Sequence, residues 1–371
     1  MVKLPKRIRN ILDLLVSDLK SRESISGVGL FGSWSRGDAV LSSDIDLLVV
    51  DRKDFDYEYV ERIEINNALI DLNYIPEKWI LRGVPPQVDQ KLYEIQVLYD
   101  RNWLLTNTKE WMRKTYWRHE RVDIRTENYL IEADTYLSRA TSAYHRGDIQ
   151  SASVYASIGL KSILKILIEV NMLPLSNSHF IEALKASADN LGMAEIFTEY
   201  VRIAKLGSSK GEIEERVDSL NTIWNEAISF TEKHKSILKT LHIKVRNNLN
   251  YYMKSSFLKG MIERTKTLID TERFLEASNY MLYPLIDMLE NYSWLKSAVT
   301  RTRFDYTRLF QSMKGSEESP TSLYLKSIKV AGLEKLTKEE AKKSLTKAKE
   351  IALNIRRERK DLIRENIKEP K

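Results

Sequence analysis

The pattern of apolar positions changes about a third of the way along the chain. Near the N-terminus, apolar residues recur at the i, i+3, i+4 and i+7 spacing of an amphipathic helix: Ile8, Ile11, Leu12, Leu15, Val16 and Leu19. Short apolar runs typical of strands follow at residues 27–31, 44–50, 68–75 and 95–100. The stretch 56–69 is ambiguous between helix and strand. We therefore expect a mixed α/β front part.

Strand alternation disappears after about residue 115, and long helical patterns replace it. The apolar face of the first is Leu130, Ala133, Leu137, Ala140 and Tyr144. The next is more apolar: Ala152, Tyr155, Ala156, Leu160, Ile163, Leu164 and Leu167. Between them, Gly147 and Asp148 provide a helix stop and an N-cap.

Breaker clusters at 206–211 and 314–320 separate further helices, and Thr337 with Glu340 has the spacing of a capping box. We expect an α+β chain, with a mixed-sheet domain followed by a large all-α helical-bundle region. The predicted domains are 1–115, a helical bundle at 116–210, and a further helical domain at 211–371 with a charged C-terminal helix.

Composition narrows the class of protein. Of 371 residues, 43% are hydrophobic and 30% charged, as in a foldable chain with a charged surface. The apolar runs are shorter than the roughly 20 residues that span a bilayer, and the N-terminus lacks the apolar region of a secretory signal. The absence of Cys excludes disulfides and thiolate metal sites. We expect a cytoplasmic protein with no membrane partner.

The net charge of +7 is compatible with a polyanionic partner such as RNA. However, residues 337–371 alternate basic with acidic side chains and place Leu345, Ala348, Ala352 and Ile355 at helical spacing. That pattern favours a solvated helix face. RNA binding and a homodimer formed through the helices stay open.

Two aspartates interrupt one of the predicted strands. Asp44 and Asp46 are two residues apart, so their side chains point to the same side of a sheet, where buried and unpaired carboxylates are costly. Asp71 is a third acid within an apolar run. Two Mg²⁺ ions about 3.5–4 Å apart are bound by bridging carboxylates of this kind. The pattern predicts a two-metal Mg²⁺ site at Asp44, Asp46 and Asp71.

A turn with phosphate-binding chemistry lies just before these acids. Gly32 lets the backbone approach a phosphate closely, and the Ser33 hydroxyl can donate to it. Arg36 either contacts a phosphate or braces the turn through Asp38 or Asp44. Phosphate donors beside metal-binding acids predict a nucleoside-triphosphate site.

The string LFGSWSRGD…SSDIDLLVV, followed by LIDL, resembles the nucleotidyltransferase superfamily related to DNA polymerase β, and most closely its minimal nucleotidyltransferases. Gly32 and Ser33 match the phosphate-binding turn, Asp44 and Asp46 the metal-binding pair, and Asp71 the third carboxylate. The resemblance covers roughly residues 1–100. Trp34 lies two positions after Gly32, where members of this superfamily often have a small residue. Its side chain either stacks on a base or packs against the protein.

The helical part, from residue 136 to 171, is similar in style to the helical domains of kanamycin-type nucleotidyltransferases and of the HEPN partners of minimal nucleotidyltransferases. HEPN ribonucleases use an Arg and a His four to six residues apart. Both Arg139 with His145 and Arg113 with His119 match, so the spacing arises easily and we do not favour ribonuclease activity.

The resemblance implies Mg²⁺-dependent transfer of a nucleoside monophosphate, by analogy AMP from ATP, to an acceptor hydroxyl with release of pyrophosphate. The acceptor, which is a small molecule, a protein or RNA, stays open. So does the general base, for which Glu127, Glu132 and Asp134 are candidates. The alternative function is a non-catalytic module that senses nucleotide and binds RNA or protein through its helices.

Overall fold

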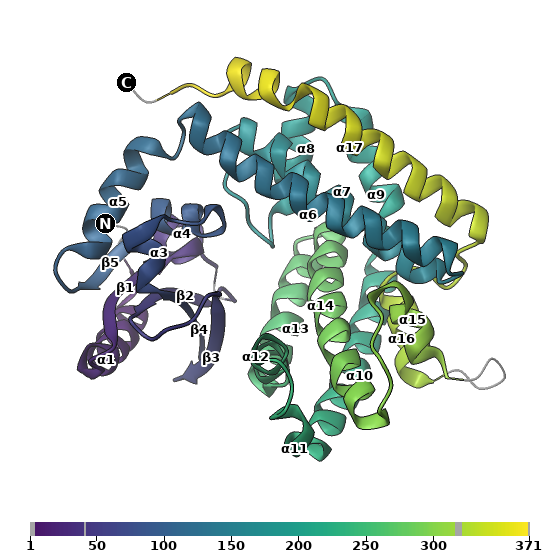
Figure 1. Cartoon of the computed structure of the whole chain (residues 1–371), viewed down its shortest axis with the longest axis horizontal. Coiled ribbons are helices and arrows are strands. Elements are labelled where there is room, and N and C mark those ends of the chain that lie inside the picture. Colours follow the sequence, from purple (N-terminus) through teal and green to yellow (C-terminus); the bar gives the residue numbers. More distant parts are fainter. Residues whose placement is uncertain (1–3, 41, 316–320, 370–371) are drawn as a thin grey trace. The chain divides into compact units, whose positions relative to one another are not determined.

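The computed structural model describes residues 4–40, 42–315 and 321–369 (Figure 1). The chain divides into two compact units. The first comprises the chain up to Arg121, the segment Asn250–Arg264 and a short stretch from Glu369, and the second comprises Val122–Leu249 and Thr265–Lys368. We describe each unit by itself.

A mixed sheet of five strands forms the centre of the first unit, in the order β3-β4-β2-β1-β5. The strands are β1 (Ile25–Phe31), β2 (Ile45–Asp51), β3 (Tyr59–Ile65), β4 (Ala68–Pro76) and β5 (Gln96–Asp100). The β2 and β4 strands are parallel, and the other pairs are antiparallel. The predicted strands are confirmed, and the ambiguous stretch contains β3. Asn66 and Asn67, both with positive φ, form the two-residue turn from β3 to β4.

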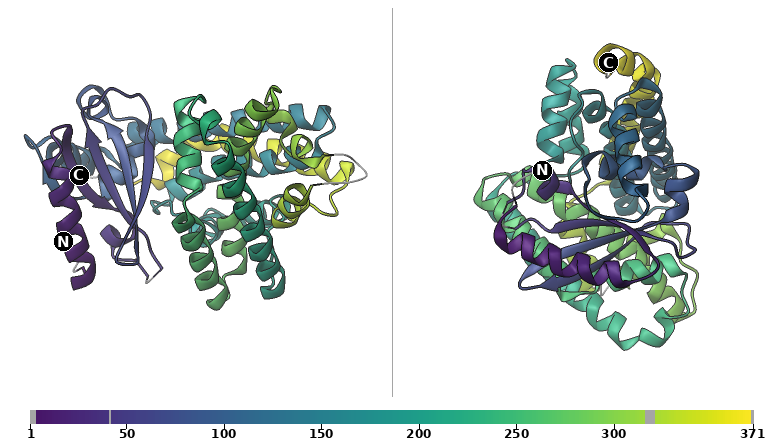
Figure 2. Two further views of the ribbon diagram at one scale, coloured as in Figure 1. Left: turned by 90° about the horizontal axis from the view of Figure 1, so that it is seen from below. Right: turned by 90° about the vertical axis from the view of Figure 1, so that its left-hand side faces the viewer.

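Helices cover both faces of this sheet. They are α1 (Lys6–Ser21), α2 (Gly32–Arg36), α3 (Glu77–Arg82), the 3₁₀ turn η1 (Pro86–Val88), α4 (Asp89–Glu94) and α5 (Leu104–Thr115). Figure 2 shows α1 along one side of the sheet. Its apolar face packs against the strands there. Leu48 and Val50 of β2 pack on the other side against Leu92 and Leu105. Because strand side chains alternate, Asp44 and Asp46 belong to this second face.

A segment from far along the chain also belongs to the first unit. Asn250–Arg264 contains the end of α12 (Ile243–Tyr252) and the start of α13 (Ser255–Asp270). Gly260 is in close contact with β4, because a Cβ at this position would lie 2.5 Å from Leu69 Cδ1. In the sequence this segment falls within the expected region 211–371, yet the structure groups it with the sheet.

The second unit is helical (Figure 1). Besides parts of α12 and α13, its elements are α6 (His119–His145), α7 (Ile149–Val170), α8 (Phe180–Asn190), α9 (Ala194–Ile203), α10 (Lys210–Lys233), α11 (Lys235–Leu238), α14 (Phe274–Thr300), the 3₁₀ turn η2 (Tyr306–Arg308), α15 (Leu309–Lys314), α16 (Ser322–Val330) and α17 (Lys338–Asn366). The chain is therefore α+β, with a mixed-sheet part followed by a helical part.

The most apolar helix, α7, forms the core of the second unit. The charged C-terminal helix α17 packs along α7 and buries Leu345, Ala348, Ala352 and Ile355, as its spacing predicts. By length and composition α7 could cross a membrane, but 89% of its most apolar window is buried inside the protein. Its apolar surface is thus covered by neighbouring helices.

The helix caps follow the sequence signals. The Asp148 side chain accepts a hydrogen bond from the Ser151 N–H, and Thr337 with Glu340 forms a complete capping box. The breaker at 206–211 lies between α9 and α10, whereas residues 316–320 of the second breaker lie outside the described residues.

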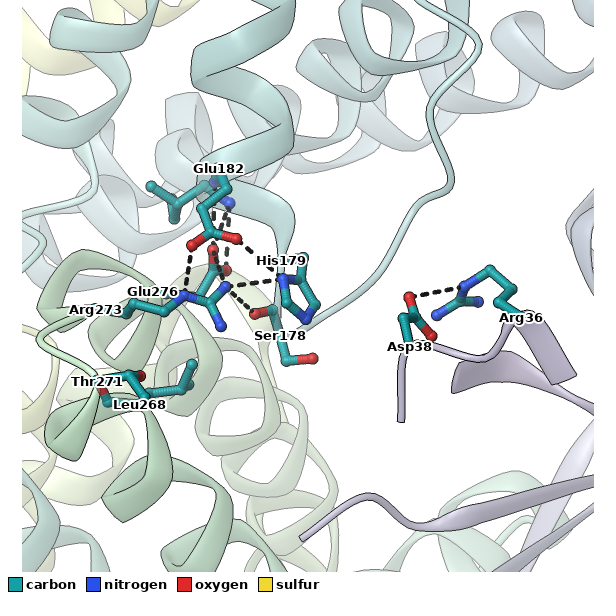
Figure 3. A network of polar contacts seen from close by, with 10 residues as sticks. Arg36, Asp38, Ser178, His179, Glu182, Leu268, Thr271, Arg273 and Glu276 are labelled. Atoms are coloured by element: carbon teal, nitrogen blue, oxygen red, sulfur yellow. Dashed lines mark hydrogen bonds and ion pairs between the residues drawn. The ribbon is translucent and has the colours of Figure 1, made fainter. Parts of the chain in front are cut away.

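A polar network joins the start of α8 to the start of α14 (Figure 3). The Glu276 carboxylate accepts a hydrogen bond of 3.0 Å from the Ile181 N–H, and so caps α8. The Arg273 guanidinium contacts Glu182 at 2.5 Å and donates to the Ser178 carbonyl at 2.8 Å. These contacts fix the two helix ends to each other.

Candidate active site

The three predicted acids lie on one face of the sheet. Asp46 of β2 is directly opposite Asp71 of β4 in the parallel register, and Asp44 precedes Asp46 by two residues. Asp71 is buried, whereas Asp44 and Asp46 are half-buried. Neighbouring strands are about 4.8 Å apart, so these carboxylates form one acid cluster.

An arginine from the adjacent strand lies in contact with this cluster. Arg62 of β3 is opposite Asp71 in the antiparallel register. Its Nε donates to Asp71 Oδ1 at 2.7 Å, and its Nη2 donates to Asp71 Oδ2 at 2.6 Å and to Asp44 Oδ2 at 2.5 Å. Sequence reasoning missed Arg62 because the stretch that contains it was ambiguous; its position in an alternating run was the available signal.

Aromatic side chains from Asn250–Arg264 surround the guanidinium. The Tyr251 hydroxyl donates to Asp71 Oδ2 at 3.0 Å. The rings of Tyr251 and Phe257 have their centroids 5.5 Å and 5.2 Å from the Arg62 guanidinium carbon, at cation–π distance. No local sequence signal connects Tyr251 with Asp71, 180 positions away.

One guanidinium does not balance three acids. Burial raises the pKa of Asp46 to about 8, together with repulsion from Asp71 and Asp44, although Lys91 and Arg62 oppose the shift. Burial also raises the pKa of Asp44, against the attraction of Arg62. Without a metal the cluster therefore favours a proton on Asp46, and a divalent cation that binds the acids would compete with that proton.

Lys91 of α4 supplies positive charge on the Asp46 side, and sequence reasoning missed it too. Its ammonium donates to Asn73 Oδ1 at 3.1 Å and pairs with Glu58, and it lies 5.3 Å from the centre of the Phe31 ring. These contacts hold the lysine near the acid cluster, where its charge acts on Asp46 from a distance.

The predicted phosphate-binding turn contacts the acid cluster directly. Gly32 has a φ of +72°, and a Cβ there would lie 2.6 Å from Asp46 Oδ2. Its N–H donates to the Glu94 carboxylate. Burial raises the pKa of that carboxyl, although Arg36 and this hydrogen bond oppose the shift. Ser33 follows, half-buried, at the start of α2. Only glycine allows the turn to approach Asp46 this closely.

Arg36 braces this turn. It contacts Asp38 at 3.2 Å (Figure 3) and Glu94 at 2.8 Å. Of the interpretations that the sequence leaves open, the salt bridge with Asp38 is present. Trp34 packs against the apolar cluster beneath α1 and donates from Nε1 to the Ser43 carbonyl at 3.4 Å. Its ring is thus used in packing.

The candidate general bases lie in the helical unit, where each has a basic partner. Glu127 contacts Arg359 at 2.9 Å, Glu132 contacts Lys165 at 2.7 Å, and Asp134 contacts Arg356. These ion pairs do not single out one of the three as a base.

The donor set fits Mg²⁺ in its chemistry. Within residues 4–40, 42–315 and 321–369, no group of three acids or histidines is already arranged to hold a metal ion. Arg62 contacts two of the carboxylates. Even so, three carboxylates on one face are the oxygen ligands that Mg²⁺ prefers, and Arg62 pairs with only two of them. Asp44, Asp46 and Asp71 are thus the residues that would hold the metal.

Three comparisons relate this chain to known proteins. Residues 12–104 match the family described as a nucleotidyltransferase domain. A proposed protein adenylyltransferase of Methanocaldococcus jannaschii, MJ1305, is 31% identical over 112 residues, which cover 26% of this chain and 75% of that protein. A nucleotidyltransferase-like protein of Exiguobacterium sibiricum 255-15 is similar over 88% of this chain and 89% of its own, with 12% identity and a TM-score of 0.33.

The family match covers the sheet that carries the acid cluster and the Gly32 turn. Transfer of a nucleotide implies a nucleotide substrate and an acceptor. The chain belongs to the nucleotidyltransferase domain family, and it is a nucleotidyltransferase.

Proposed function

We propose that this protein transfers AMP from ATP to an acceptor hydroxyl. The observation that carries the proposal is the contact between two halves of one site: Asp46 opposes Asp71 across parallel strands, and the Gly32 turn lies against Asp46. Acids for a divalent cation and a turn for phosphates are thereby side by side. ATP as the donor is supported by the relative that is named a protein adenylyltransferase.

In the proposed reaction, the acceptor oxygen attacks the α-phosphorus of ATP in line with the leaving group. A bond forms between the acceptor oxygen and the α-phosphorus, the bond from the α-phosphorus to the β-phosphate oxygen breaks, and pyrophosphate leaves. The acceptor hydroxyl gives up its proton. The products are the adenylylated acceptor, pyrophosphate and a proton.

The protein side chains orient the reactants. Gly32 lets the backbone approach the triphosphate, Ser33 holds it through its hydroxyl, and Arg36 keeps the turn in shape through Asp38 and Glu94. The acid cluster would hold Mg²⁺ through Asp44, Asp46 and Asp71. When bound, Mg²⁺ neutralises charge on the phosphate oxygens.

We place the acceptor hydroxyl on a protein, which the name of the relative supports. A small molecule and RNA are the alternatives, and the product of the reaction distinguishes them.

The test uses each of the four nucleoside triphosphates labelled at the α-phosphate, with Mg²⁺ and a lysate of the source organism. We expect label from ATP to reach a protein, with release of pyrophosphate, and no transfer by the Asp46→Asn variant. Label on RNA or on a small molecule would correct the acceptor. Nucleotide binding without pyrophosphate release would instead favour a sensing module, and equal transfer by the variant would contradict the proposed site.

A further inference from the structure

Arg62 occupies the position of a counter-ion within the acid cluster. Its guanidinium makes a bidentate contact with Asp71 and reaches Asp44 from the same Nη2 atom. The side chain is only 5% exposed. Fork-shaped contacts of this kind are among the stronger charge-assisted hydrogen bonds, so Arg62 holds two of the three predicted metal ligands.

The segment Asn250–Arg264 keeps the guanidinium in this position. Tyr251 and Phe257 flank it with their rings, and the Lys254 ammonium donates to the Arg62 carbonyl at 2.6 Å. Gly260 completes the enclosure, because a Cβ there would lie 3.2 Å from Arg62 Nη1. An arginine held from several sides loses little further freedom when it binds the carboxylates.

Arg62 contacts the three acids of the cluster unequally. Both oxygens of Asp71 and one oxygen of Asp44 accept hydrogen bonds from Arg62. Asp46, by contrast, lies against the Gly32 turn and is influenced by Arg62 through charge at longer range. A divalent cation that binds all three acids therefore competes with Arg62 for oxygens of two of them.

We propose, building on the proposed function, that Arg62 is a positioning residue that serves as a built-in counter-ion. It holds Asp44 and Asp71 while no divalent cation is bound, and it releases carboxylate oxygens when the metal enters. The apparent affinity for metal is then lower than the intrinsic affinity, by the fraction of molecules in which Arg62 has released its oxygens.

The test measures Mn²⁺ binding to the full chain by the electron paramagnetic resonance signal of the free ion. Arg62→Met removes the competing charge but keeps a flexible apolar side chain between the rings. We expect Mn²⁺ to bind at least about tenfold more tightly than in the wild type. We also expect the melting temperature without metal to fall and to recover more on addition of Mn²⁺ than it does in the wild type.

Arg121→Met is the matched control. Arg121 makes a comparable pair with Asp89, with an Nε–Oδ2 distance of 2.7 Å, and lies 5.4 Å from the Trp111 ring in the same unit. It is not among the residues that contact the acid cluster. This variant should lower the melting temperature without changing Mn²⁺ affinity.

A second variant covers the case in which Arg62→Met does not fold. Phe257→Leu keeps the arginine and removes one ring beside it, so Mn²⁺ affinity should rise by a smaller factor. If Mn²⁺ binds the wild type and both variants bind it equally or more weakly, the counter-ion role is wrong and the proposed function stands. If none of these proteins binds Mn²⁺, both proposals fail.

Discussion

Asp46 and Asp71 are directly opposed on the parallel strands β2 and β4. Like charges at opposed positions of a sheet are destabilising, and burial increases their cost. A fold that retains such a pair is less stable than it would be without it. Functional sites commonly carry a cost in stability of this kind. Arg62 offsets part of this loss through its contacts with Asp71 and Asp44.

Asp46→Asn should therefore separate stability from activity. Removing the carboxylate charge relieves repulsion within the acid cluster, so we expect the variant to be more stable without metal by roughly 1–3 kcal/mol. Transfer of labelled AMP should be abolished, because the amide is a poor ligand for Mg²⁺. Thermal melts and the labelling assay measure the two effects.

Asp13→Asn, on the exposed face of α1, is the control for this substitution and should change neither quantity. An Asp46→Asn protein that is less stable than the wild type and still active would show that the acids have a structural role instead.

Gly32→Ala should destabilise the protein more than Gly147→Ala, which introduces the same kind of backbone strain without a steric clash. Both Gly32, with a φ of +72°, and Gly147, with a φ of +82°, are in the left-handed region. A Cβ at Gly147 meets nothing within 4 Å, whereas at Gly32 it meets Asp46 Oδ2 at 2.6 Å. We expect a loss of about 1 kcal/mol for Gly147→Ala and an additional 1–3 kcal/mol, roughly, for Gly32→Ala.

Urea denaturation of the two variants measures this difference. Only Gly32→Ala should also weaken the binding of a non-hydrolysable ATP analogue. Equal losses in the two variants would mean that Asp46 and the turn are not in the close contact described above.

Glu290 should make the stability of the protein depend on pH. Burial in the helical unit raises its pKa to about 7 from 4.5, although Arg139 lies 3.4 Å away. The folded protein thus binds more protons than the unfolded chain between these values. Stability is highest below about pH 4.5 for this group and decreases as the pH rises to about 7, by up to about 3 kcal/mol.

Glu290→Gln keeps the shape and removes the charge, so it should flatten the change in melting temperature between pH 5 and pH 7.5. Glu195→Gln, at an exposed position of α9, should leave that change as it is in the wild type. A profile for Glu290→Gln that parallels the wild type would contradict a raised pKa.

Lys161 should lower the stability of the helical unit near neutral pH. This side chain of α7 is 8% exposed, with its ammonium 3.4 Å from the centre of the Tyr283 ring and 4.6 Å from that of Phe180. Desolvation lowers its pKa well below the usual value. Since the unfolded chain then binds more protons, stability increases with pH up to the normal pKa of lysine.

We expect Lys161→Met to raise the melting temperature at pH 7, by an amount that shrinks towards pH 10. Lys165→Met, one turn further along α7, removes an ammonium that is bonded to Glu132 at 2.7 Å and should not stabilise the protein. A lower melting temperature for Lys161→Met would instead indicate that the protonated ammonium is stabilised by the two rings.

Local patterns in the sequence sufficed for much of the fold. The strands β1, β2, β4 and β5 follow from short apolar runs, and the capping box at Thr337 from residues three positions apart. The stretch with β3 was ambiguous, because Val, Ile, Glu and Arg alternate there at spacings that suit a strand or a short helix. Its pairing with β4 through the Asn66–Asn67 turn makes it a strand.

The sequence by itself determined which residues are proposed for the chemistry, since a Gly-Ser turn followed by Asp44 and Asp46 needs only neighbouring positions to be recognised. Tertiary structure alone decided what surrounds them. Arg62 reaches Asp71 because two strands pair in one register, and Tyr251 reaches it from 180 residues away because a distant segment packs on the sheet. Such contacts depend on how the chain folds back on itself, and no local pattern encodes that.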